Sequence, residues 1–141
     1  MANLKGGSFE KQIKDAFHRL ESFGVGRVRK SDNLTHSDKL AQKREMYLRD
    51  ITSFFKSQNL NSKLNTLFTN ENLNNFFNSR LENLSSKTKE NYLRGFSSML
   101  KGLEQQNIYI PLHFEDKEFF NNKVKIIKDE ADIIIENRYI N

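Results

Sequence analysis

Only one proline, Pro111, and six glycines occur among the 141 residues of this chain. Proline and glycine are the residues that most often interrupt helices and form tight turns, so their scarcity favours long helices. Strict alternation of polar and apolar residues is also missing, and the chain contains no Asn-Gly turn. The sequence therefore predicts an all-α protein.

Apolar side chains recur at intervals of three and four residues, which is the pattern of a buried helical face. The first predicted helix begins at a capping residue, Ser8, and ends near Phe23, before Gly24. The second follows the segment Thr35–Asp38, which resembles a capping box with Thr35 as its first residue. In residue numbers, the predicted helices are 8–23, 37–58, 70–83 and 86–107, and the Asn-rich residues 59–68 form a connection.

Two glycines, Gly95 and Gly102, lie inside the last of these helices, where each costs about 1 kcal/mol relative to alanine. Residues seven apart share nearly one helical face, so close packing against a neighbouring helix would compensate.

Ile108–Pro111 is expected to leave the helix as an extended segment, because the residue before a proline disfavours helix. The tail, 112–141, is again mostly helical in pattern, although Ile133–Ile135 equally fits the start of a strand.

Charge is unevenly distributed along the chain, whose net charge is +5. Residues 27–49 contain seven bases and three acids, and residues 85–101 contain four bases and one acid. Residues 115–136 contain four bases and seven acids. Two basic stretches and an acidic tail indicate a polyanionic partner, chiefly nucleic acid.

Several classes of function are disfavoured by what the sequence lacks. There is no cysteine, so disulfides and cysteine-based zinc sites are excluded, and the three histidines are too scattered to form a metal-binding pair. No apolar leader or membrane-spanning run occurs, and the Gly24–Gly26 segment lacks the rest of a phosphate-binding loop. We therefore expect a cytoplasmic protein with no cofactor, metal, membrane partner or small-molecule substrate.

One segment, Leu84–Leu100, resembles the last helix of the core-binding domain of tyrosine recombinases of the phage-integrase type. It opens with Ser and Lys, continues with Thr88 and, four residues later, Tyr92, and then runs into an apolar, aromatic stripe. The exit through Ile108–Pro111 is similar to that of the family, and Phe68–Phe77 looks like the family's short third helix. The long basic helix from Ser37 to Gln58 looks like its second.

This resemblance implies an all-α, orthogonal four-helix bundle of the SAM-like type over residues 8–111, with an extra C-terminal helical or mixed segment. Residues 1–7 would be a disordered N-terminus. Residues 112–141 would be a segment or linker toward a catalytic domain that this chain does not contain. The implied function is to clamp the duplex of a recombination site, with double-stranded DNA and other recombinase protomers as partners.

In the family, the second and fourth helices face DNA, and both basic stretches of this chain fall there. At the start of the fourth helix, backbone N–H groups and the helix dipole attract phosphate. The simpler alternatives are that Ser85 or Ser86 only caps the helix and that the basic residues form a solvated face. The predicted DNA contacts are Lys39, Lys43, Arg44, Ser86, Lys87, Thr88, Lys89, Asn91 and Arg94, with Arg27, Arg29 and Lys30 as additional phosphate contacts.

No catalytic residues are predicted in this chain. The family's catalytic domain needs an arginine and histidine clamp with a His-x-x-Arg element and a nucleophilic tyrosine, and none of His18, His36 and His113 is followed by that spacing. Tyr139 lies outside any basic cluster, so it is not expected to be a nucleophile.

The main rival to DNA binding is a helical protein-interaction module, which an exposed face of Phe residues would favour. An enzyme with an unrecognised site is a third, more distant alternative.

Overall fold

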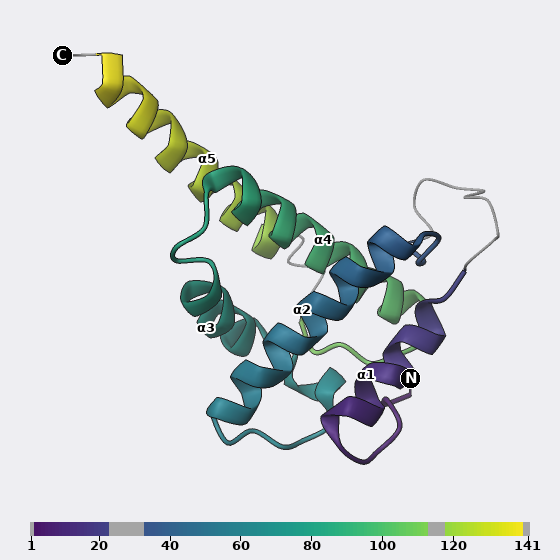
Figure 1. The fold of residues 1–141 in the computed structure, drawn as a ribbon. Helices are drawn as coiled ribbons and strands as arrows, with labels where there is room; N and C mark the ends of the chain where they lie inside the picture. Colours follow the sequence, from purple (N-terminus) through teal and green to yellow (C-terminus); the bar gives the residue numbers. More distant parts are fainter. Residues whose placement is uncertain (1, 23–32, 113–117, 140–141) are drawn as a thin grey trace.

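The computed structural model describes residues 2–22, 33–112 and 118–139, and this part of the chain is all-helical (Figure 1). It confirms the all-α prediction, and the described residues form no strand beyond two isolated bridges, Ala2 with Ile108 and Glu21 with Thr35. None of the described helices is long and apolar enough to cross a membrane. The helices are α1 (Phe9–Leu20), α2 (Asp38–Ser57), the 3-10 turn η1 (Leu64–Leu67), α3 (Asn70–Arg80), α4 (Ser86–Gln105) and α5 (Glu118–Tyr139).

Each of the first four α-helices begins after a serine or threonine whose side chain accepts a hydrogen bond from the first turn. These N-caps satisfy backbone N–H groups that have no partner inside the helix. The prediction of Ser8 is confirmed, but α2 is capped by Ser37 and not by Thr35. The caps are Ser8, Ser37, Thr69 and Ser85.

The two longest of these helices, α2 and α4, both end at an asparagine with a positive φ. Asn59 has φ of 58° and Asn107 has φ of 67°, and asparagine tolerates this left-handed region better than most residues. The residue after each, Leu60 or Ile108, donates its N–H back to a carbonyl of the last turn. This is the Schellman pattern, so these two asparagines of the Asn-rich chain end helices.

The core is built around the fully buried ring of Phe96 on α4. Five aromatic rings from α2, α3, α4 and the turn before α3 surround it, with centroids 5.4 to 6.3 Å away. Tilted, edge-on and stacked contacts of this kind add to the free energy gained by burying the rings. The five residues are Tyr47, Phe68, Phe76, Phe77 and Tyr92.

Both helical glycines of α4 lie where neighbouring elements come closest, as their position predicts. A Cβ atom on Gly95 would lie 3.0 Å from the ring of Tyr47 on α2 and closer still to its hydroxyl group. A Cβ atom on Gly102 would lie 2.7 Å from the carbonyl oxygen of Asn33 and 2.9 Å from Leu20. The two glycines therefore allow α4 to pack against two different parts of the fold.

A polar network ties together α2, α3 and α4. The Tyr92 hydroxyl donates to Asp50 Oδ2 over 2.9 Å, and Arg80 Nε donates to the same oxygen over 2.8 Å. Burial raises the pKa of Tyr92, and the Asp50 carboxylate beside it acts in the same direction. Tyr92 therefore contributes both an apolar ring to the core and a hydrogen-bonding hydroxyl at its edge.

The segment before α1 packs against the rest of the fold through Leu4. Leu4 is 1% exposed, and its N–H donates to the side-chain oxygen of Asn65 over 3.1 Å. The Asn65 amide, itself fully buried, donates to Asn3 and to the carbonyl of Tyr109. This one side chain in η1 holds the N-terminal segment and the exit from α4 together.

The described residues 118–139 of the tail form a single helix, α5, and not a strand. It packs on α4, and Phe120, Val124 and Ile127 are buried in the same core as the other helices. In Figure 1, the C-terminal half of α5 continues beyond α3 and α4, and no other described element lies beside it.

We expect Gly102→Ala to lower the free energy of unfolding by about 1 to 3 kcal/mol, because the new methyl group would meet a backbone carbonyl and a buried leucine. A decrease in the free energy of unfolding would be informative, since alanine in place of glycine normally stabilises a helix by about 1 kcal/mol. Denaturant unfolding measures the change. Ser53→Ala, at an exposed position of α2, is the control and should change stability by less than about 0.5 kcal/mol. A stabilised Gly102→Ala protein would contradict the close packing described here.

Candidate nucleic-acid interface

One face of α4 carries the exposed basic residues of this helix. Lys87, Asn91, Arg94 and Lys101 are exposed, and they recur at spacings of four, three and seven residues. This spacing places them on a single stripe, about 21 Å long at 1.5 Å per residue. The half-buried Ser98 lies on the same stripe.

The stripe lies between α2 on one side and α5 on the other. On the α2 side, Arg44 Nη2 donates to Ser98 Oγ over 3.4 Å. On the α5 side, Lys128 approaches Glu90 to 3.6 Å, and Glu90 in turn accepts from Arg94 Nε over 3.0 Å. The hydrogen bond from Arg94 lowers the pKa of Glu90, so this carboxylate stays charged and offsets part of the positive charge of the stripe.

Two further bases of α2, Lys39 and Lys43, are exposed, as the sequence predicts. Lys43 directly precedes Arg44, whose contact with Ser98 brings the N-terminal half of α2 beside the C-terminal half of α4. Lys39 lies one helical turn before Lys43. We call the six exposed residues of the two helices the α2–α4 basic surface: Lys39, Lys43, Lys87, Asn91, Arg94 and Lys101.

Arg44, in contrast, does not lie on an exposed face, so this part of the prediction is wrong. The residue is 1% exposed, and Arg44 Nη1 donates to Thr35 Oγ1 over 2.8 Å. Ser98, the second acceptor, donates its own proton to Asn33 Oδ1 over 2.9 Å. The guanidinium group therefore joins α2, α4 and residues 33–35 from the inside, and Thr35 accepts this hydrogen bond instead of capping α2.

The start of α4 agrees with the prediction, because the helix begins at Ser86. Ser85 Oγ accepts the N–H of Thr88, so Ser85 is the cap and Ser86 is the half-buried first residue of the helix. Lys87 and Thr88 are exposed. Ser85 is therefore the N-cap of α4, and Lys87 is the exposed base at this end of the helix.

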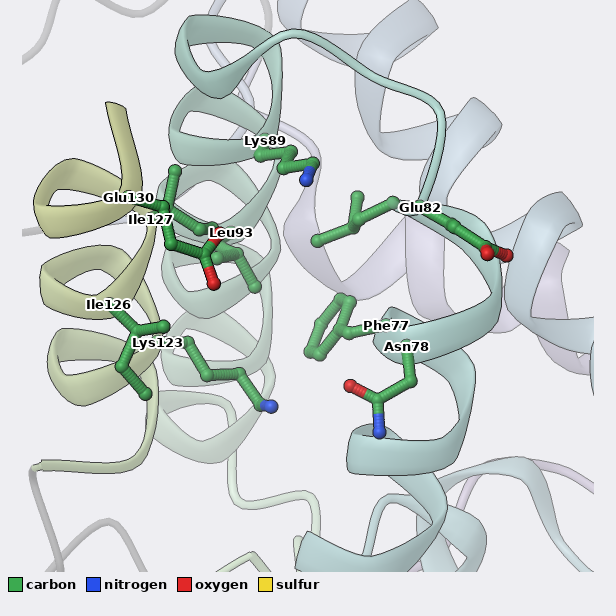
Figure 2. A pocket seen from close by; sticks show the side chains of 10 residues that line it. Phe77, Asn78, Glu82, Lys89, Leu93, Lys123, Ile126, Ile127 and Glu130 are labelled. Carbon is green, nitrogen blue, oxygen red and sulfur yellow. The ribbon is translucent and has the colours of Figure 1, made fainter. Parts of the chain in front are cut away.

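Lys89 points away from the stripe and lines a pocket between α3, α4 and α5 (Figure 2). Phe77 and Leu93 form apolar walls, and the side chain of Lys123 enters from α5. Burial lowers the pKa of Lys123. Because Glu82 and Glu130 also line this pocket, both signs of charge are present and the arrangement does not favour an anion.

The acidic tail lies closer to α4 than the separation in sequence suggests. The contact of Lys128 with Glu90 places the middle of α5 beside the first turns of α4, and the acids Asp129, Glu130 and Asp132 follow directly. Negative charge near Lys87 weakens the attraction of this end for phosphate. The C-terminal part of the stripe, near Lys101, is therefore the more favourable region for a polyanion.

The structure thus brings together six predicted contacts on exposed parts of α2 and α4: Lys39, Lys43, Lys87, Thr88, Asn91 and Arg94. The predicted phosphate contacts Arg27, Arg29 and Lys30 lie outside the described residues. Lys101 was not predicted as a contact, although its spacing of seven residues from Arg94 was a usable signal. Exposed lysine and arginine beside an uncharged amide can bind phosphates and reach a groove edge.

Comparisons of the chain with protein-family models, with curated proteins and with solved structures give no match.

We expect Arg44→Met to lower the free energy of unfolding by about 1 to 3 kcal/mol, because two hydroxyl groups lose a buried hydrogen-bond donor. Lys43→Met, at the neighbouring exposed position, is the matched control and should change stability by less than about 0.5 kcal/mol. Denaturant unfolding of both proteins measures the difference. Equal effects of the two substitutions would show that Arg44 does not hold α2 and α4 together.

Proposed function

We propose that this chain binds duplex DNA through the α2–α4 basic surface, as the core-binding domain of a tyrosine recombinase does. The observation that carries the proposal is the stripe of exposed Lys87, Asn91, Arg94 and Lys101, with Lys39 and Lys43 beside it on α2. Phosphate contacts by such residues supply most of the affinity for DNA, and an amide such as that of Asn91 adds base preference.

We further propose that α1 to α4 form the orthogonal four-helix bundle of that family, with α5 as an addition. Direct packing of α1 on α2, of α2 on α4 and of α1 on α4 supports this arrangement. The rings of Phe76 and Phe77 on α3 also pack against Phe96 of α4, which is consistent with this arrangement of helices. In this proposal α1 and α3 position the two helices that face DNA, and catalysis belongs to a separate domain.

The rival function, a protein-interaction module with an exposed Phe face, receives less support. Ten of the twelve Phe residues lie in the described part of the chain, and none of these ten is exposed. Seven are buried in the core and three are half-buried against it. Their role is packing, so they offer no surface to a protein partner.

We expect Lys87→Ala with Lys101→Ala to weaken DNA binding at every sequence and to flatten its salt dependence. Each lost phosphate contact lowers the slope of log K against log salt by about 0.9, so the pair should lower it by about 1 to 2. Fluorescence anisotropy with a labelled duplex at several salt concentrations measures both quantities.

Lys14→Ala with Lys56→Ala is the matched control, because it removes the same net charge from exposed positions outside this surface. It should leave the slope nearly unchanged. Lys89→Ala should also have less effect than Lys87→Ala, because Lys89 lines the pocket next to α5. Equal losses from both lysine pairs would show that net charge alone drives binding, and the surface assignment would have to be abandoned.

A further inference from the structure

A small pocket lies where the first turns of α5 meet the C-terminal half of α4. Its polar lining consists of two bases, two serines and two asparagines, and no acid is among the described residues that line it. The volume of about 180 Å³ is several times the roughly 30 Å³ that a water molecule occupies in the liquid, so the pocket has room for a phosphate group. The six polar residues are Asn33, Arg94, Ser97, Ser98, Lys101 and Asn121.

Ser97 is the residue that most clearly indicates a polar ligand. It is 8% exposed and lines the pocket, and its hydroxyl has no hydrogen-bond partner among the described residues. Leaving a buried hydroxyl without a partner is costly, so such a group is normally satisfied by water or by a ligand. An anion oxygen in the pocket would accept this hydrogen bond.

The two bases supply the charge that an anion requires. Arg94 bonds to Glu90 through Nε, and within the described part of the chain its two Nη groups have no acceptor. Lys101 is exposed, and it forms no ion pair with any described residue. Glu90 and Glu104 lie one turn outside these bases on α4, but neither lines the pocket. Glu90 is in addition already paired with Lys128.

The direction of α5 adds to the positive potential of the pocket. Lys128 of α5 contacts Glu90 near the start of α4, whereas Asn121, two turns earlier on α5, lines the pocket together with Lys101. The two helices therefore run antiparallel, and the N-terminal end of α5 lies beside the C-terminal end of the basic stripe. The aligned peptide dipoles give this end of a helix a partial positive charge, which favours a bound anion.

We propose that this pocket binds one phosphate group, with Arg94 and Lys101 as cations and Ser97 and Asn121 as further hydrogen-bond donors. In the DNA complex proposed above, the group is a backbone phosphate of the duplex, and this assignment rests on the proposed function. The helix α5 then belongs to the DNA interface and is not only a support for α4. Free phosphate has the same chemistry, so the two sources are tested separately.

Inorganic phosphate is the first probe, added to the full chain at constant ionic strength. Backbone amide shifts in two-dimensional NMR spectra should change most at Ser97, Lys101 and Asn121, with a dissociation constant of about millimolar. Asn121→Asp puts a carboxylate into the pocket and should weaken this binding about tenfold, because like charges repel at short range. Asn122→Asp is the matched control, since it adds the same charge at the next exposed position, which does not line the pocket. Equal effects of the two variants would overturn the proposal.

Two further variants should change the affinity for inorganic phosphate in opposite directions. Ser97→Ala removes the unpaired hydroxyl and should weaken binding about threefold to tenfold. Its helical circular dichroism signal should be retained, because alanine favours a helix. Glu118→Gln removes a negative charge one turn before Asn121 and should tighten binding. Unchanged binding by Ser97→Ala together with weaker binding by Glu118→Gln would contradict the pocket.

A labelled duplex, followed by fluorescence anisotropy, is the second probe. Asn121→Asp should weaken duplex binding several-fold more than Asn122→Asp does. If phosphate binds in the pocket but no duplex binds, the pocket stands with free phosphate as its ligand, and the proposed DNA function fails. If duplex binding depends on Lys87 and Lys101 while both aspartate variants have equal effects on duplex and on phosphate, the pocket is refuted and the proposed function stands.

Discussion

The close crossing of α2 and α4 is the constraint on which the rest of the structure depends. The ring of Tyr47 lies directly on the backbone of α4 because residue 95 has no side chain. This approach brings Tyr47 within 4.7 Å of Tyr92, measured between ring centroids, and next to Phe96. The aromatic rings of α3 then close the core from the other side. Any side chain at residue 95 would separate the helices and disturb all of these contacts together.

The same crossing determines what the surface can do. Because α2 and α4 cross closely, the buried guanidinium of Arg44 can reach Ser98, and the exposed bases of both helices flank one shared boundary. Arg44, although charged, therefore has a structural role at this boundary, whereas its neighbour Lys43 remains exposed to solvent. Burying a cation is costly unless hydrogen bonds compensate, which explains why Thr35 and Ser98 are placed around it.

The sequence predicted the helices well because their determinants are local. Caps such as Ser8 and Thr69, and apolar residues at helical spacing, act within one or two turns. The burial of Arg44 and the position of Lys89 in a pocket could not be predicted in this way. Periodicity identifies the apolar face of a helix, but it does not show which neighbouring element covers the residues beside that face. The buried Leu4 donates a hydrogen bond to Asn65, 61 residues away, and no local pattern reveals such a contact. For the proposed DNA contacts, the sequence located the helices, while the exposure of each side chain required the fold.

The packing of α5 on α4 determines how charge is distributed along the α4 stripe. Lys128 next to Glu90 fixes the middle of α5 at the start of α4, so the acids that follow lie near Lys87 and away from Lys101. A polyanion is therefore favoured toward Lys101 and α2, where these acids are distant.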